Sequence, residues 1–143
     1  MPETIAIASD HAGFDVKQFL VGELTRRGFT VLDLGTQDRS SVDYPDFADA
    51  LAAALGDGRA RRGVLICGTG IGIGIAANRH RHVRAAVCHD ATSARLARQH
   101  NNANVLALGA RLIGTEVALD CLATFLDTAY EGGRHDRRIA KMS

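Results

Sequence analysis

Cys67 stands directly before a run in which glycine occupies every second position from Gly68 to Gly74. Glycine lets a backbone come close to a ligand and present several N–H groups at the start of a helix, an arrangement that binds anions. Beside such N–H groups, a cysteine at the end of a strand has its thiolate form stabilised. The segment therefore predicts an anion-binding loop that carries a reactive thiol. Cys88 and Cys121 have apolar neighbours and are expected to be inert packing residues.

Two nucleotide-binding interpretations compete for the same loop. A P-loop requires a lysine after its glycines, and no lysine occurs between Lys17 and Lys141, which excludes it. A dinucleotide fingerprint is nearly matched by Gly72, Gly74 and Ala77, but these residues lie several positions beyond the predicted strand. The chain also lacks room for the second half of a dinucleotide fold. A tight turn alone would explain one or two of the glycines.

Further residues that could do chemistry lie near the ends of other predicted elements. Asp10 and His11 follow the first strand, and His100 and Asn101 precede the last one. A histidine titrates near neutral pH and is a candidate acid or base, although taken singly each of these residues could equally cap a helix or lie on the surface. No HExxH motif or carboxylate cluster indicates a metal.

Two arginines in the C-terminal tail stand four residues apart. Arg134 and Arg138 would share one face of a helix, and two guanidinium groups so placed suit one phosphate. A solvated basic helix end, favoured by the helix dipole, is the alternative. Together with the thiol loop, the pair favours an enzyme acting on a small phosphorylated substrate over a nucleotide-binding module.

Composition narrows the class of protein further. The 143 residues are enough for one domain, and 17 basic against 16 acidic residues leave a net charge of +1. That balance predicts neither nucleic-acid nor membrane binding. An odd set of three cysteines without a CxxC pair argues against disulfides and a zinc site and favours a reducing compartment. We therefore expect a cytoplasmic protein.

Short apolar segments alternate five times with helical patterns, which predicts an α/β fold. We expect a single domain over residues 1–143, built on a doubly wound, open, parallel five-stranded sheet of the Rossmann-like kind, with a C-terminal helical arm at about 130–143. Ligands bind such sheets outside the carboxyl ends of the strands. The expected strands are 4–9, 29–34, 63–67, 83–88 and 104–108, and the expected helices are 14–27, 47–55, about 71–78, 91–99, 115–129 and a short basic one after Gly133.

Several motifs, taken in order along the chain, resemble those of the B-type ribose-5-phosphate isomerases, a family that also includes allose-6-phosphate and galactose-6-phosphate isomerases. The segments that carry the resemblance are SDHAG at 9–13, DYPD at 43–46, CGTGIG at 67–72, AAN at 76–78, RQHNN at 98–102 and GGRH at 132–135. The combination of SDHAG with CGTGIG is specific to that family, whereas either motif alone is only suggestive.

The resemblance implies an aldose–ketose isomerisation through a cis-enediolate, without metal or organic cofactor. It implies that Cys67 is the base that moves a proton between C2 and C1 of the sugar phosphate. Thr69 and the N–H groups of residues 68–72 would hold the enediolate oxygen. His100, helped by Asp10, would open the furanose ring. Some family members use a glutamate a few positions after the cysteine, but Ile71 and Ile73 stand there in this chain.

The resemblance also implies the residues that bind substrate. His11, Arg134 and Arg138 would hold the phosphate, Asn101 and Arg111 would complete the pocket, and Tyr44 would line the sugar site. Family members are dimers or tetramers whose sites combine residues from two subunits, so neither the tail nor His100 need reach Cys67 of its own chain. For this chain we expect a homodimer or homotetramer, because it carries the full set of site residues. The full expected binding set is Asp10, His11, Tyr44, Gly68, Thr69, Gly70, Ile71, Gly72, Asn101, Arg111, Arg134 and Arg138.

The first hypothesis for function is therefore the interconversion of D-ribose 5-phosphate and D-ribulose 5-phosphate in the pentose phosphate pathway. The second is the same chemistry on a 6-phosphohexose such as allose 6-phosphate. A non-catalytic module that binds a phosphosugar or a nucleotide is the alternative from a different class, and it would need the glycine loop but not the thiol.

Overall fold

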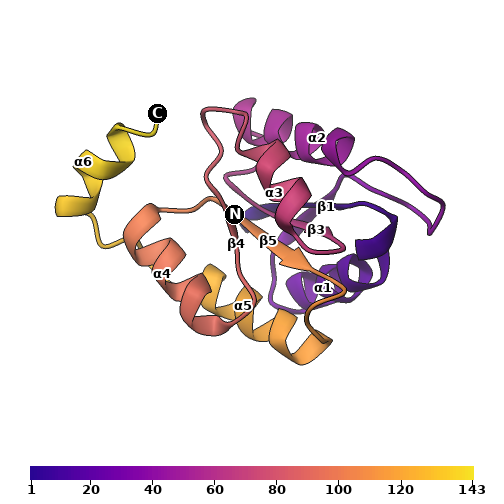
Figure 1. The fold of residues 1–143 in the computed structure, drawn as a ribbon. Helices are drawn as coiled ribbons and strands as arrows, with labels where there is room; N and C mark the ends of the chain where they lie inside the picture. The colour runs from indigo at the N-terminus through magenta and orange to yellow at the C-terminus, as the bar shows by residue number, and fades with distance from the viewer.

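The computed structural model describes all residues from 1 to 143, and its centre is a five-stranded parallel sheet (Figure 1). The strands stand in the order β2-β1-β3-β5-β4, so the chain moves outward from β1 to β2 and then crosses back to β3. Such a change of direction leaves a crevice at the carboxyl ends of the strands. The strands are β1 (Thr4–Ser9), β2 (Thr30–Asp33), β3 (Arg62–Cys67), β4 (Ala85–Val87) and β5 (Val105–Gly109).

Helices cover both faces of the sheet, as expected for a doubly wound fold (Figure 1). The core on one face joins the sheet to α1, α4 and α5, and the core on the other joins it to α2 and α3. Central strands are consequently buried on both sides, and every residue of β5 is buried. The helices are α1 (Phe14–Arg26), α2 (Tyr44–Gly56), α3 (Ile71–Ala77), α4 (Ala91–Asn101), α5 (Thr115–Asp127) and α6 (Arg134–Ala140), with a 3₁₀ turn at His11–Gly13.

Strand register brings three strand ends together. Ser9 pairs with Ile66, and Cys67 pairs with Gly109, so the carboxyl ends of β1, β3 and β5 lie side by side. The fold class predicted from the sequence is confirmed.

Several helix boundaries differ from the prediction, and two of these differences concern expected site residues. The sequence was expected to break at Tyr44–Asp46, but α2 begins at Tyr44 and accommodates Pro45 in its first turn. Proline fits there because the missing N–H has no intrahelical partner at that position. Helix α4 was expected to end at Gln99 and instead continues to Asn101, so that His100 and Asn101 are helical rather than loop residues.

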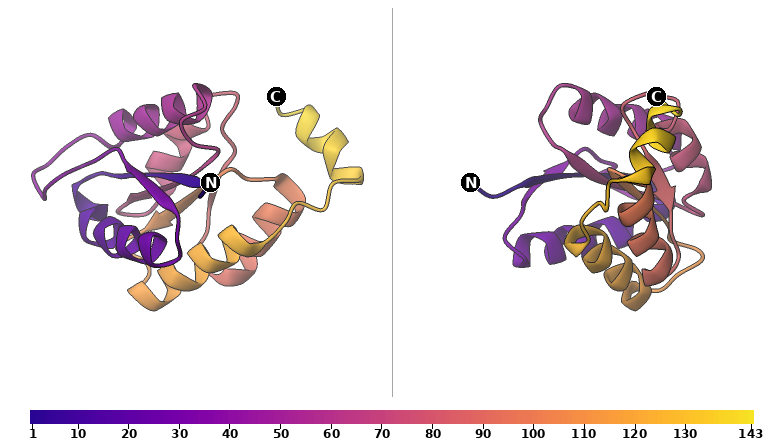
Figure 2. Two further views of the ribbon diagram at one scale, coloured as in Figure 1. Left: turned by 180° about the vertical axis from the view of Figure 1, so that it is seen from behind. Right: turned by 90° about the vertical axis from the view of Figure 1, so that its left-hand side faces the viewer.

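The C-terminal segment stands apart from the sheet. Gly132 and Gly133 both adopt positive φ, at 70° and 62°, and turn the chain into α6. Figure 2 shows α6 projecting beyond the end of α4 at one side of the molecule. No helix is long and apolar enough to cross a membrane.

Candidate active site

A pocket of about 380 Å³ opens at the carboxyl ends of β1 and β3, where the crevice was expected. Residues from four segments line it: the turn after β1, the start of α2, the loop between β3 and α3, and the segment after β5. These residues are Asp10, His11, Ala12, Tyr44, Cys67, Gly68, Thr69, Ile71, Gly72 and Arg111. All but Ala12 belong to the set proposed from the sequence.

The thiol of Cys67 is held by the loop that follows it. The N–H of Gly70 donates to Sγ of Cys67 over 3.1 Å, which fixes the position of the sulfur beside the loop. Gly70 adopts φ of +76°, and a Cβ there would lie 2.9 Å from the backbone carbon of Leu108. Only glycine combines this φ with that close approach.

Thr69 presents its hydroxyl group for donation. Its Oγ1 accepts a hydrogen bond from the N–H of Ile71 over 3.1 Å, so its own hydrogen remains free to point elsewhere. The end of β5 packs tightly under this loop, because a Cβ on Gly109 would lie 2.6 Å from the carbonyl oxygen of Thr69.

Backbone hydrogen bonds bring Arg111 into the pocket. The N–H of Ala110 donates to the Cys67 carbonyl, and the N–H of Arg111 donates to the Gly68 carbonyl, each over 2.9 Å. The Arg111 side chain then crosses Gly68, where a Cβ would lie 3.4 Å from Arg111 Cδ. The sequence carries no sign of this link, since backbone groups of any residue type could make it.

Asp10 and His11 are fixed by the backbone as well. Asp10 is buried and accepts the N–H of Gly13 at its Oδ1 over 3.2 Å. His11 accepts the N–H of Val42 at Nδ1, also over 3.2 Å, so Nε2 is the nitrogen that carries hydrogen. Val42 belongs to the loop between β2 and α2, and its role was not foreseen from the sequence.

Tyr44 closes one side of the pocket from the first turn of α2. Its ring lies against Gly72, where an added Cβ would lie 2.7 Å from the ring carbon Cζ. Tyr44 is 40% exposed, so the pocket is open beside it.

Comparison with known proteins identifies the family to which the chain belongs. The sequence model of the Ribose/Galactose Isomerase family matches residues 5–142. The chain belongs to the ribose/galactose isomerase family. Ribose-5-phosphate isomerase B of Escherichia coli is 47% identical over 135 residues, which cover 94% of this chain and 91% of that protein.

Solved structures of ribose/galactose isomerases have the same fold. A ribose 5-phosphate isomerase from Thermotoga maritima is 51% identical and superposes with a TM-score of 0.96, covering 98% of this chain and 97% of that one. Ribose-5-phosphate isomerase B from Clostridium thermocellum is 47% identical, also with a TM-score of 0.96, over 97% and 94% of the two chains.

In this ribose/galactose isomerase, the chain does not bring its own His100, Asn101, Arg134 and Arg138 to the Cys67 pocket. Helix α4 runs from the carboxyl edge of the sheet back to the amino edge, so its last residues lie where β4 and β5 begin (Figure 1). Both arginines lie on α6, which projects from that end of the molecule (Figure 2).

Instead, His100 meets the C-terminal arm of its own chain. Its ring stacks on that of His135 with centroids 4.5 Å apart and an interplanar angle of 17°. Glu131 Oε1 lies 4.0 Å from His100 Nε2 and 3.6 Å from His135 Nε2. Burial is the main cause that lowers the pKa of His135.

Three potential metal-ligating atoms meet at this point, because His100, Glu131 and His135 place them within 4.8 Å of one another. The stacked rings are nearly parallel, however, and a nitrogen lone pair lies in the plane of its ring. The two lone pairs therefore do not converge on one ion unless a ring turns, so the cluster as it stands is a poor metal site.

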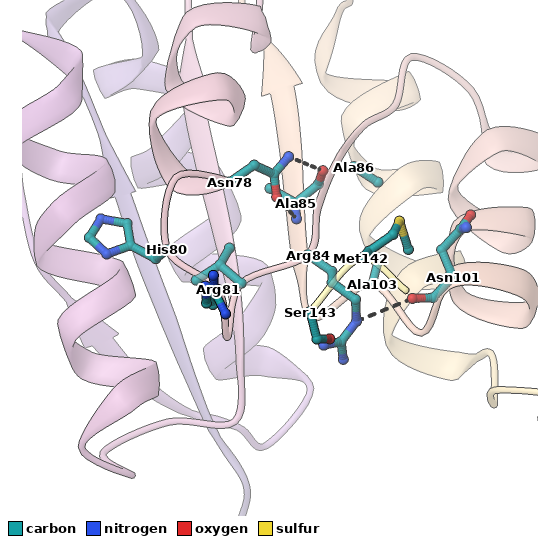
Figure 3. Close-up of a pocket in the computed structure, with 11 residues that line it drawn as sticks. Asn78, His80, Arg81, Arg84, Ala85, Ala86, Asn101, Ala103, Met142 and Ser143 are labelled. Atoms are coloured by element: carbon teal, nitrogen blue, oxygen red, sulfur yellow. Dashed lines mark hydrogen bonds between the residues drawn. The ribbon is translucent and has the colours of Figure 1, made fainter. Parts of the chain in front are cut away.

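Asn101 lines a second pocket, of about 390 Å³, between the segment that leads into β4 and the end of the chain. Figure 3 shows Met142 and Ser143 beside Arg84 and Asn101 in this pocket. None of the residues around Cys67 lines it. The sequence-derived site is thus divided into two groups at opposite edges of the sheet.

Proposed function

We propose that the protein is an aldose–ketose isomerase that interconverts D-ribose 5-phosphate and D-ribulose 5-phosphate without a metal or organic cofactor. The observation that carries the proposal is the Cys67 thiol, held by the Gly70 N–H in the same pocket as Thr69 and the glycine loop. Ribose-5-phosphate isomerase B of Escherichia coli and the ribose 5-phosphate isomerase of Thermotoga maritima are 47% and 51% identical to this chain, which supports the same substrate.

In the proposed reaction, the Cys67 thiolate removes the proton from C2 of the open-chain aldose and returns it to C1, while the hydroxyl proton on O2 passes to O1. Negative charge develops on the sugar oxygens as the cis-enediolate forms. The Thr69 hydroxyl group and the N–H groups of Gly68, Thr69 and Gly72 stabilise that charge, since the N–H groups of Gly70 and Ile71 already donate to Cys67 Sγ and Thr69 Oγ1. In other oxyanion sites each well-placed donor contributes about 3–4 kcal/mol. His100 with Asp10 donates a proton to the ring oxygen to open the furanose.

The phosphate group of the substrate is bound by residues of the Cys67 pocket and by residues of the group at the opposite edge of the sheet. His11 offers its Nε2–H, because Nδ1 is occupied by the Val42 N–H. Arg111 lies in the same pocket, whereas Arg134 and Arg138 come from the arm of another subunit. Asn101 completes the sugar site from that subunit, beside its His100.

A composite site of this kind requires a homodimer, alone or within a homotetramer. Apolar side chains beside the pocket support a second copy as the covering partner. Ile71 and Ile75 stand one turn apart on α3 and are 50% and 56% exposed, and Leu112 after β5 is 55% exposed. Burying such side chains against a second copy is favourable at about 25 cal/mol per Å².

We further propose that the protein works in the cytoplasm. All three cysteines are free thiols, and each is buried within the fold. Free thiols suit a reducing compartment.

The second candidate function is the same isomerisation of a sugar phosphate with a different number of carbon atoms. D-erythrulose-4-phosphate isomerase of Pectobacterium atrosepticum is 44% identical over 97% of this chain and 92% of that protein. The 6-phosphohexoses remain within the same chemistry.

The test is turnover of ribose 5-phosphate, allose 6-phosphate and erythrulose 4-phosphate by the purified protein in excess EDTA. We expect the pentose to be isomerised with the highest kcat/KM. Cys67→Ala should abolish turnover while Cys88→Ala preserves it. Turnover of none of the three, with binding of ribose 5-phosphate retained by both variants, would establish a binding module instead.

A further inference from the structure

A third pocket, distinct from those of Cys67 and Asn101, lies at the amino edge of the sheet, opposite the Cys67 pocket. It has a volume of about 360 Å³, and no hydrophobic residue lines it. The segments that form it precede or begin β1, β3, β4 and β5, and the end of α4 completes it. The lining residues are Glu3, Arg61, Arg62, Arg84, Arg98, Asn102 and Asn104.

Four guanidinium groups face one carboxylate in this pocket. That carboxylate is already paired, because Arg62 donates from Nε to Glu3 Oε2 over 2.8 Å and from Nη2 to Oε1 over 2.6 Å. The hydrogen bond from Arg62 lowers the pKa of Glu3, which keeps it ionised. The charges of Arg61 and Arg98 also lower the pKa of Glu3, but neither these two arginines nor Arg84 makes a salt bridge.

Neutral carbonyl groups hold two of these arginines in place. Arg98 donates from Nη1 to Asn102 Oδ1 over 2.9 Å and to the Ala103 carbonyl over 2.7 Å. Arg84 donates from Nε to the carbonyls of Asn101 and Asn102, the first of which is drawn in Figure 3. These contacts cap the end of α4, but they leave Nη2 of Arg98 and both terminal nitrogens of Arg84 without a hydrogen bond.

The positive groups are also close enough to act on one another. Burial is the first cause that lowers the pKa of Arg98, and the neighbouring charges of Arg62 and Arg84 lower it further. Like charges held together in a half-buried position repel, and an anion between them removes that cost. Helix capping explains the bonded nitrogens of Arg84 and Arg98, and it does not explain Arg61, which lines the pocket without a side-chain hydrogen bond or salt bridge.

We propose that this pocket binds a small, multiply charged anion through a phosphate or pyrophosphate group. Guanidinium groups suit such a group, since Arg61 and Arg84 each keep two terminal nitrogens for parallel hydrogen bonds to its oxygens, and Arg98 keeps Nη2. Asn102 and Asn104 add amide groups at the rim. The site is separate from the proposed isomerase site, and the inference does not depend on the proposed function.

The test is isothermal titration calorimetry with pyrophosphate on the full-length protein in phosphate-free buffer. Arg61→Glu reverses one charge at an exposed residue that donates no side-chain hydrogen bond, so the fold is preserved. Arg79→Glu is the matched control, since Arg79 is also exposed and unpaired but does not line the pocket. We expect R61E to weaken one class of pyrophosphate sites by about tenfold or more, and R79E to leave it nearly unchanged.

A second measurement locates the ligand. Pyrophosphate should shift the Nε–H resonances of Arg84 and Arg98 in ¹H–¹⁵N spectra of the wild type. Turnover of ribose 5-phosphate by R61E should equal that of the wild type. If R61E and R79E weaken pyrophosphate binding equally, the effect comes from the overall charge of the protein and the proposal is wrong. If the arginine resonances do not shift, pyrophosphate binds only in the Cys67 pocket, which also overturns the proposal.

Discussion

At the scale of single residues, the surroundings of the three thiols distinguish them. Cys67 lines the pocket and receives the Gly70 N–H at its sulfur. Burial raises the pKa of the Cys88 thiol and raises that of Cys121 to about 11. Near pH 8 the last two are therefore protonated and enclosed, and a thiolate is the form that reacts with alkylating agents.

Iodoacetate at about pH 8 should consequently alkylate Cys67 alone and abolish isomerase activity. Mass spectrometry of the digested protein identifies the modified cysteine, and residual turnover is measured on the same sample. Substrate or inorganic phosphate should slow the reaction by occupying the pocket. Full alkylation of Cys67 with unchanged turnover would show that the sulfur is not the base.

Replacing glycine by alanine should have opposite effects at Gly70 and at Gly22. Gly70→Ala should distort the loop and reduce kcat strongly, because φ is +76° and the new Cβ would press on the backbone of β5. Gly22→Ala, on α1 with open space around it, should stabilise the fold by about 0.5–1 kcal/mol. Urea unfolding and turnover of both variants test the pair. Normal activity in G70A would mean that the loop tolerates a rearrangement.

At the scale of elements, the alternation of strands and helices could be predicted because its signals are local. The end of α4 could not. The helix continues through His100 because Arg84, from the segment that leads into β4, donates to the carbonyl groups of Asn101 and Asn102 at its end. A contact between segments far apart in the chain leaves no local pattern in the sequence, so it could not be predicted. The orientation of His11 by the Val42 N–H escaped prediction for the same reason.

The buried ion pair between α1 and β2 gives an element-scale prediction. Lys17 is fully buried, and its Nζ lies 2.7 Å from Asp33 Oδ2, which is partly exposed. Asp33→Asn leaves a buried ammonium group without its counter-charge and should cost about 3 kcal/mol of unfolding free energy. Lys17→Met should cost less, because the remaining carboxylate can reach water. Urea unfolding at neutral pH compares the two, and a larger loss in K17M would contradict the argument.

The link between the starts of β1 and β3 should depend on pH. Arg62 lowers the pKa of Glu3 below its ordinary value of 4.5. Since the folded-state pKa is the lower one, the stabilisation is fully present above about pH 4.5 and is lost as the pH falls through the folded-state pKa. The urea midpoint of Glu3→Gln should therefore fall less steeply below that pH than the wild-type midpoint does. Glu116→Gln, which removes no ion pair, is the control and should keep the wild-type slope.

At the scale of the whole molecule, the candidate site divides between two edges of the sheet. Sequence patterns predicted most of its residues, and the resemblance carried the remainder, including the expectation that sites combine two subunits. The proposed pairing of one chain's Cys67 with another's His100 would depend on how two surfaces meet. No periodicity along one chain encodes that contact.

Subunit complementation tests the composite site. Cys67→Ala and His100→Ala should each be inactive alone. When equal amounts are unfolded together and refolded, about half of the dimers are hybrids with one intact site, so about a quarter of wild-type activity should return. A mixture of Cys67→Ala with Thr69→Ala should recover none, because both changes fall in the same half of the site. No recovery in the first mixture would mean that each chain completes its own site.

The scarcity of lysine has a practical consequence for handling the protein. Lys17 is enclosed in its ion pair with Asp33, so Lys141 is the only lysine whose amine meets solvent. Apart from the chain's amino terminus, amine-directed dyes, crosslinkers and sensor surfaces will all attach one residue beyond α6. A molecule immobilised in this way is held by its arm, and coupling through an introduced surface cysteine on α1 would leave that arm free.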